Sequence, residues 1–73
     1  MPRRPLPPGH IPPRVRPLIP LIGEGRSNGE IAAALTLSSH TVENYVSELL
    51  HLTGARNRTQ LAVWISTGQF SIE

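Results

Sequence analysis

Residues 27–54 read SNGEIAAALTLSSHTVENYVSELLHLTG and contain two helix-start signals separated by a short turn. The first is a capping box, in which the Ser27 hydroxyl accepts from the amide of Glu30 and the Glu30 carboxylate accepts from the amide of Ser27. Three apolar residues follow at the spacing of one helical face, namely Ile31, Ala32 and Leu35. We therefore expect a short helix from Ser27, closed by a turn over residues 35–37.

The second signal is Ser38, a good N-cap for the segment that follows it. Apolar side chains and one threonine then recur on one face, at about 100° per residue: Val42, Tyr45, Val46, Leu49, Leu50 and Thr53. The opposite face is polar and holds His40, Glu43, Asn44, Ser47, Glu48 and His51. Gly54 stands where a left-handed C-terminal cap belongs. The pattern predicts the longest helix of the chain, from about Ser38 to Thr53.

A further helix is indicated before this pair. Its apolar residues fall at i, i+3, i+4 and i+7: Val15, Leu18, Ile19 and Ile22. Pro17 is acceptable at the first helical position, whereas Pro20 would remove a donor and clash with the preceding turn, at a cost of roughly 3 kcal/mol. We therefore expect a helix that is short, kinked or frayed and that ends at Gly23 or Gly25.

A last helix should follow Asn57, which can cap it, with Gln60 three residues later. It presents Leu61, Trp64 and Ile65 along one side, and Gly68 should end it. Two interpretations of Trp64 stay open. The indole either fills the core or, with its two apolar neighbours, gains its burial from a second copy of the chain.

Composition limits the chain to one small domain, because 73 residues bury only about 60% of the surface that the unfolded chain exposes. The net charge is +2, but residues 11–73 hold five arginines against five glutamates, so total charge gives no argument for nucleic-acid binding. We expect residues 1–10, rich in proline, to be a tail or linker, and residues 11–73 to be the domain. No stretch looks able to span a membrane, and the expected location is cytoplasmic.

Catalysis and metal binding find no support in the residue pattern. His40 and His51 are eleven residues apart on one expected helix, about 16 Å along its axis, which is too far to share a metal ion. Ser39 beside His40 does not suggest a hydrolase, because the chain has neither an aspartate nor a Gly-x-Ser-x-Gly element. We therefore expect no enzyme activity, no cofactor, no metal and no small-molecule substrate.

The order of the two central elements is typical of a helix-turn-helix. A short capped helix, a turn of three or four residues and a longer helix with a polar outer face make this arrangement, in which the second helix enters the major groove of DNA. Any small helical bundle also has polar outer faces, so the pattern alone leaves a plain bundle open.

Specific residues favour the helix-turn-helix. They are Gly25–Ala32, then the pairs Leu37-Ser38 and Thr41-Val42, and finally Gly54–Arg58. With these residues, Ile11–Ile65 closely resembles the LuxR-type family of bacterial transcription regulators. The resemblance implies an all-α, four-helix domain, usually at the C-terminus of a response regulator or a ligand-sensing activator, that dimerises through its last helix.

The resemblance also implies double-stranded DNA as the partner. The expected DNA-contacting residues are Ser27, Asn28, Ser38, Ser39, His40, Thr41, Val42, Glu43, Asn44, Tyr45, Ser47 and His51. The family commonly has lysine after its Thr-Val pair, where this chain has Glu43, and further basic residues where it has Ser47, His51 and Leu52. Fewer phosphates should therefore be neutralised, and we expect weak binding.

Base reading remains chemically feasible, because Asn44 can bond adenine N6 and N7 together and Glu43 can accept from cytosine N4. We therefore expect sequence-specific DNA binding in bacterial transcription regulation. A weak homodimer should form through Leu61, Trp64 and Ile65. The alternative is a degenerate helix-turn-helix that acts as a protein-interaction or dimerisation module without binding DNA, and Glu43 and Glu48 favour it.

Overall fold

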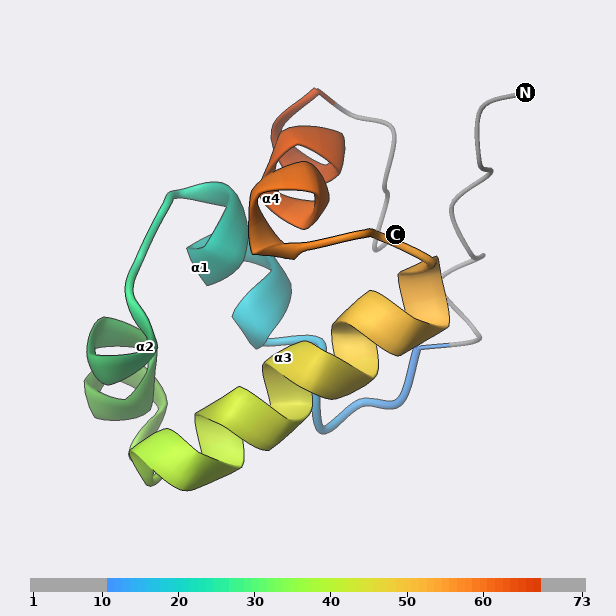
Figure 1. Cartoon of the computed structure of the whole chain (residues 1–73). Coiled ribbons are helices and arrows are strands. Elements are labelled where there is room, and N and C mark those ends of the chain that lie inside the picture. The colour runs from blue at the N-terminus through green and yellow to red at the C-terminus, as the bar shows by residue number, and fades with distance from the viewer. Residues whose placement is uncertain (1–10, 68–73) are drawn as a thin grey trace.

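The computed structural model describes residues 11–67 of the 73-residue chain (Figure 1). This range contains no strand and four helices, which are α1 (Leu18–Gly23), α2 (Asn28–Leu35), α3 (Ser39–Thr53) and α4 (Arg58–Ser66). The predicted all-α, four-helix architecture is confirmed. The expected tail, residues 1–10, and the expected end of the last helix, Gly68, lie outside the described residues.

Helix α3 forms the longest side of the fold, with α2 beside its start and α1 and α4 packed together on the other side of the core (Figure 1). The core is made by buried apolar residues from all four helices, from the segment before α1 and from the loop between α3 and α4: Ile11, Val15, Leu18, Ile19, Ile22, Ile31, Ala32, Val42, Val46, Leu49, Ala55 and Leu61. Buried Thr53 donates to the carbonyl of Leu49 at 2.8 Å, so its hydroxyl is satisfied.

The prediction that Pro20 destabilises the first helix is wrong. Helix α1 is short, as predicted, but it begins at Leu18 with Pro17 as its N-cap, so Pro20 stands in the first turn. First-turn amides have no acceptor within the helix, and proline there removes no hydrogen bond. The Arg16 carbonyl, one turn earlier, already accepts from the amide of Ile19 at 3.0 Å. The periodicity located the helix correctly but misplaced its first residue.

The predicted capping box of α2 is confirmed. The amide of Glu30 donates to the Ser27 hydroxyl at 3.1 Å, and the amide of Ser27 donates to the Glu30 carboxylate at 2.9 Å. The helix ends at Leu35, and its C-cap is Thr36, whose φ of 57° and ψ of 49° are left-handed. A β-branched residue is uncommon in this conformation, which glycine or asparagine usually occupies. The turn into α3 therefore contains local backbone strain.

Both predicted caps of α3 are present. The Ser38 hydroxyl accepts from the amide of Thr41 at 3.0 Å, and left-handed Gly54 donates its amide to the carbonyl of Leu50 at 2.9 Å. At the next helix, the Asn57 side chain accepts from the amide of Gln60 at 2.8 Å. The Gln60 side chain accepts from the amide of Arg56 rather than from that of Asn57, so the cap at α4 is extended by one residue.

None of the helices within residues 11–67 is long and apolar enough to cross a membrane.

Candidate nucleic-acid interface

The outward face of α3 has a polar stripe along its centre. His40, Asn44, Ser47 and His51 are all exposed and follow one another at steps of four, three and four residues. At 100° per residue these four positions fall within about 60° of each other around the helix axis. The stripe therefore offers imidazole, amide and hydroxyl groups, without a carboxylate, along the length of α3.

The two glutamates of α3 lie on opposite sides of this stripe. Glu43 is exposed on one side, and Glu48 is half-buried on the other. The helix contains neither lysine nor arginine. Glu48 forms an ion pair with Arg14, which lies in the segment before α1. The Glu48 carboxylate is thus paired with a cation and the Glu43 carboxylate is exposed, a difference that the sequence pattern did not indicate.

The stripe contains four of the twelve expected contact residues, and six others lie at the N-cap of α3 or elsewhere on that helix. Ser38, Ser39 and Glu43 are exposed, and Thr41 and Tyr45 are half-buried. The Ser38 hydroxyl accepts from the amide of Thr41 and donates to the Thr41 hydroxyl at 2.8 Å, so it is already engaged within the chain.

Val42 requires a correction. Its side chain is 0% exposed and belongs to the core. A side chain that is buried between α3 and the rest of the domain cannot contact DNA, so its expected role at the interface is wrong. Its place in the Thr-Val pair is explained by packing.

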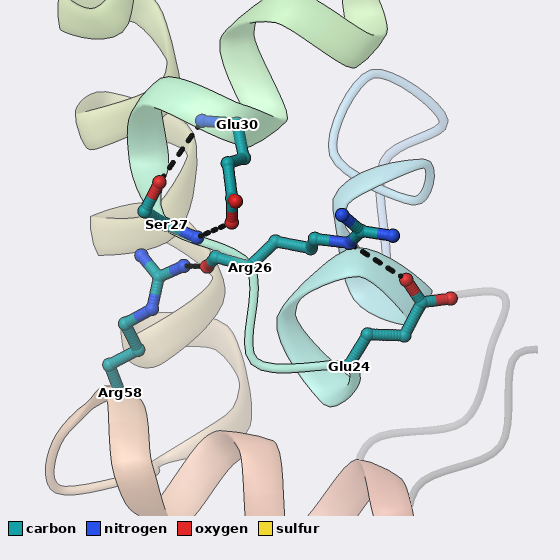
Figure 2. Close-up of polar contacts among 5 residues, drawn as sticks. All are labelled: Glu24, Arg26, Ser27, Glu30 and Arg58. Atoms are coloured by element: carbon teal, nitrogen blue, oxygen red, sulfur yellow. Dashed lines mark hydrogen bonds and ion pairs between the residues drawn. The ribbon is translucent and has the colours of Figure 1, made fainter.

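The start of α2 forms the second part of the candidate surface (Figure 2). Ser27 is exposed, while Asn28 is half-buried and accepts through Oδ1 from the guanidinium of Arg58. The same guanidinium donates to the carbonyl of Arg26, whose side chain in turn pairs with Glu24 at 3.2 Å. Both predicted contact residues, Ser27 and Asn28, are therefore held close to two arginines.

Of the three expected dimer residues on α4, one is fully buried and two are half-buried. Leu61 is 0% exposed and lies in the core, so its expected place at an interface is wrong. Trp64 and Ile65 are half-buried and pack against that core. The exposed apolar side chain of α4 is Val63, which is 48% exposed and was not predicted.

Three arginines at or near this surface were not predicted as functional residues. Arg26 and Arg58 stand within the stretches that carry the family resemblance, so the sequence contained a signal for them, whereas Arg14 had none beyond its charge. Their contacts span 30 to 34 residues, a separation that helical periodicity does not reveal. Among residues 11–67, no group of three potential metal-ligating side chains is present.

Comparison with known proteins identifies the family of this chain. The family model described as bacterial regulatory proteins, luxR family, matches residues 14–65, which include all four helices except the last residue of α4. The chain belongs to the LuxR family.

Curated LuxR-family relatives include three with named roles. The two-component response regulator PprB of Pseudomonas aeruginosa is 40% identical over 58 residues, which cover 80% of this chain and 21% of the relative. The DNA-binding transcriptional activator DevR/DosR of Mycobacterium tuberculosis is 47% identical over 49 residues, 67% of this chain and 23% of the relative. The probable transcriptional regulator ycf29 of Pyropia yezoensis is 45% identical over 49 residues, 67% of this chain and 22% of the relative.

The chain thus matches less than a quarter of the length of these LuxR-family relatives. No solved structure gives a significant match to it.

Proposed function

We propose that this LuxR-family domain binds double-stranded DNA in bacterial transcription regulation, with α3 in the major groove. The observation that carries the proposal is the exposed polar stripe of α3, formed by His40, Asn44, Ser47 and His51. One relative is named as a DNA-binding transcriptional activator, and another as a two-component response regulator. We also propose a cytoplasmic location, because a protein that binds bacterial DNA must be where that DNA is.

The dimensions of α3 suit a groove. Its 15 residues span about 22 Å, and the major groove is about 12 Å wide, which admits one α-helix. Capping at Ser38 and Gly54 satisfies groups at both helix ends, so the stripe needs little ordering when DNA arrives. Asn44 stands near the middle of the stripe and is exposed.

The residue types of the stripe favour a particular base. Asparagine bonds adenine N6 and N7 with both ends of its amide, whereas guanine is usually read by arginine or lysine. Since α3 has neither of the latter, we propose that Asn44 selects adenine. Glu43 beside it can accept from cytosine N4.

The start of α2 is proposed to contact the phosphate backbone. Ser27 is exposed there, and the capping box engages the amides of Ser27 and Glu30 but leaves those of Asn28 and Gly29, which with the helix dipole favour an anion. Arg58 adds positive charge at the same place, whereas the guanidinium of Arg26 is paired with Glu24. Contacts of this kind orient a protein on DNA without reading sequence, which leaves the base reading to α3.

We further propose that two copies associate weakly through α4, with Val63 and Trp64 in place of Leu61 at the centre of the contact. Val63 is 48% exposed and Trp64 half-buried, so both can lose more surface to a partner. Two copies would then occupy half-sites about one helical turn apart.

The competing function is a protein-interaction module that no longer binds DNA. Two observations favour it, the exposed carboxylate of Glu43 and the lack of any lysine or arginine on α3. Such a module predicts no saturable DNA binding at moderate salt.

Asn44→Ala separates these functions. We expect the parent chain to select a preferred duplex from a random pool, and the substitution to cost roughly 1 to 3 kcal/mol on that duplex but little on random DNA. Fluorescence anisotropy at two salt concentrations measures both values. Thr59→Ala, at an exposed position of α4, is the matched control and should leave both unchanged. A parent that shows no saturable binding at about 50 mM salt contradicts the proposal.

A further inference from the structure

The positive charge nearest to the acidic residues of α3 comes from outside that helix. Helix α3 carries Glu43 and Glu48 and no lysine or arginine. Arg14, located 34 residues before Glu48 in the sequence, places its guanidinium on the Glu48 carboxylate. Among residues 11–67, no cation lies within ion-pair distance of Glu43. One acidic flank of the stripe is therefore neutralised and the other is not.

Arg14 is held in place by the folded segment around it. Its neighbour Val15 is 0% exposed and Ile11 is 1% exposed, so both anchor the segment in the core. The Arg16 side chain donates to the carbonyl of Ile11 at 2.9 Å, and the amide of Val15 donates to the carbonyl of Pro12 at 3.1 Å. Less backbone freedom is lost when Arg14 forms its ion pair, because the segment is already ordered.

An ion pair of this kind contributes little to folding, since its side chains are 56% and 27% exposed and water screens them. Its effect on an approaching polyanion is different. Phosphates that come within about 10 Å of Glu48 at 0.1 M salt would meet an uncompensated negative charge if Arg14 were absent. The pair removes this repulsion, whereas Glu43, on the other side of the stripe, has no cation of residues 11–67 within ion-pair distance.

We propose that Arg14 is a positioning residue for DNA binding, which acts by binding Glu48 and neutralising the acidic flank of α3. This inference rests on the proposed DNA-binding function. It differs from a direct phosphate contact, because the effect of Arg14 passes through a second residue. It therefore predicts that the importance of Arg14 depends on whether residue 48 carries a charge.

A double-mutant cycle on the full chain tests this dependence. The variants are Arg14→Gln, Glu48→Gln and the double variant, with affinity for the selected duplex measured by anisotropy at about 50 mM salt. Arg14→Gln should weaken binding about three- to tenfold when Glu48 is present, and less than about twofold when it is replaced. Arg14→Lys keeps the charge and should stay within about twofold of the parent.

Arg56→Gln is the matched control, because Arg56 is an exposed arginine in the loop between α3 and α4. Its effect should be the same in both Glu48 backgrounds. An equal loss for Arg14→Gln in both backgrounds would show a direct phosphate contact and overturn the inference, as would no loss in either. If the parent does not bind DNA, the proposed function is wrong. If the parent binds DNA but the effects of Arg14→Gln and Glu48→Gln are independent, only the inference about Arg14 is wrong. Circular dichroism melts ensure that the compared variants are folded.

Discussion

Gly23 of α1 lies so close to Ile65 of α4 that a Cβ atom on residue 23 would be 2.6 Å from Ile65 Cγ2. Real Cβ atoms do not approach a neighbour so closely, so any side chain at residue 23 would push the two helices apart. This contact joins α1 to α4, the two helices that pack most extensively against one another.

Gly23→Ala should therefore lower the free energy of unfolding by about 1 to 3 kcal/mol, because the added methyl overpacks the contact with Ile65. Urea denaturation measures the change. Gly29→Ala is the matched control, since an added Cβ there meets nothing nearer than Ser27 Oγ at 3.9 Å. That substitution should be neutral or should stabilise by up to about 1 kcal/mol. Equal effects of the two substitutions would show that α1 and α4 can separate without cost.

Thr36→Gly should stabilise the fold by about 1 kcal/mol. Thr36 has a φ of 57° at the end of α2, and an L-residue with a branched side chain pays a steric cost in this conformation that glycine does not. Thermal unfolding followed by circular dichroism measures the gain. Thr59→Gly, within the first turn of α4, should instead destabilise. A loss of stability in both variants would mean that Thr36 stabilises its turn by contacts that outweigh the strain.

Glu43→Lys should raise the general affinity for DNA and steepen its salt dependence by about one unit, because it replaces a repelled carboxylate with a cation beside the stripe. Glu43→Gln should give a smaller increase without a new phosphate contact. Affinity measured on random duplex at several salt concentrations gives the slope directly. Identical slopes for the parent and the lysine variant would place residue 43 away from the phosphates.

Val63→Glu should abolish self-association and leave the monomer folded. A charge at this exposed position stays in water in the monomer but would be buried in the interface of a dimer. Sedimentation velocity gives the association, and a melting curve gives the stability. Trp64→Ala tests the neighbouring residue and should weaken both, because the indole packs partly against the core. Unchanged association of Val63→Glu would move the interface to another surface.

The sequence predicted local structure well wherever a single residue type determines it. Ser27, Ser38, Gly54 and Asn57 all cap the helix ends at which they were expected. These signals depend on a few neighbouring residues, so they can be recognised without knowing the rest of the fold. The error at Pro20 came from misplacing the first residue of the helix, because the free-energy cost of a proline changes sharply between the first and second turns.

The sequence predicted the surface less well. Helical periodicity shows which residues share a face, but not how deep each side chain lies, so Val42 and Leu61 were expected at interfaces although both are completely buried. The ion pair between Arg14 and Glu48 joins distant parts of the chain, and no short-range pattern indicates it. The two glutamates of α3 therefore looked equivalent in the sequence and differ in the fold.

Arg58 is the first residue of α4, yet its guanidinium binds two groups at the start of α2, about 30 residues earlier. If two copies pair through α4, and if the start of α2 contacts phosphates as proposed, this arginine connects the two surfaces directly. One extra base pair between two half-sites would rotate them by about 35° relative to each other, so a pair of domains connected in this way should fit one spacing better than the next. The distance between half-sites, and not only the sequence of each, then decides which promoters the protein can occupy.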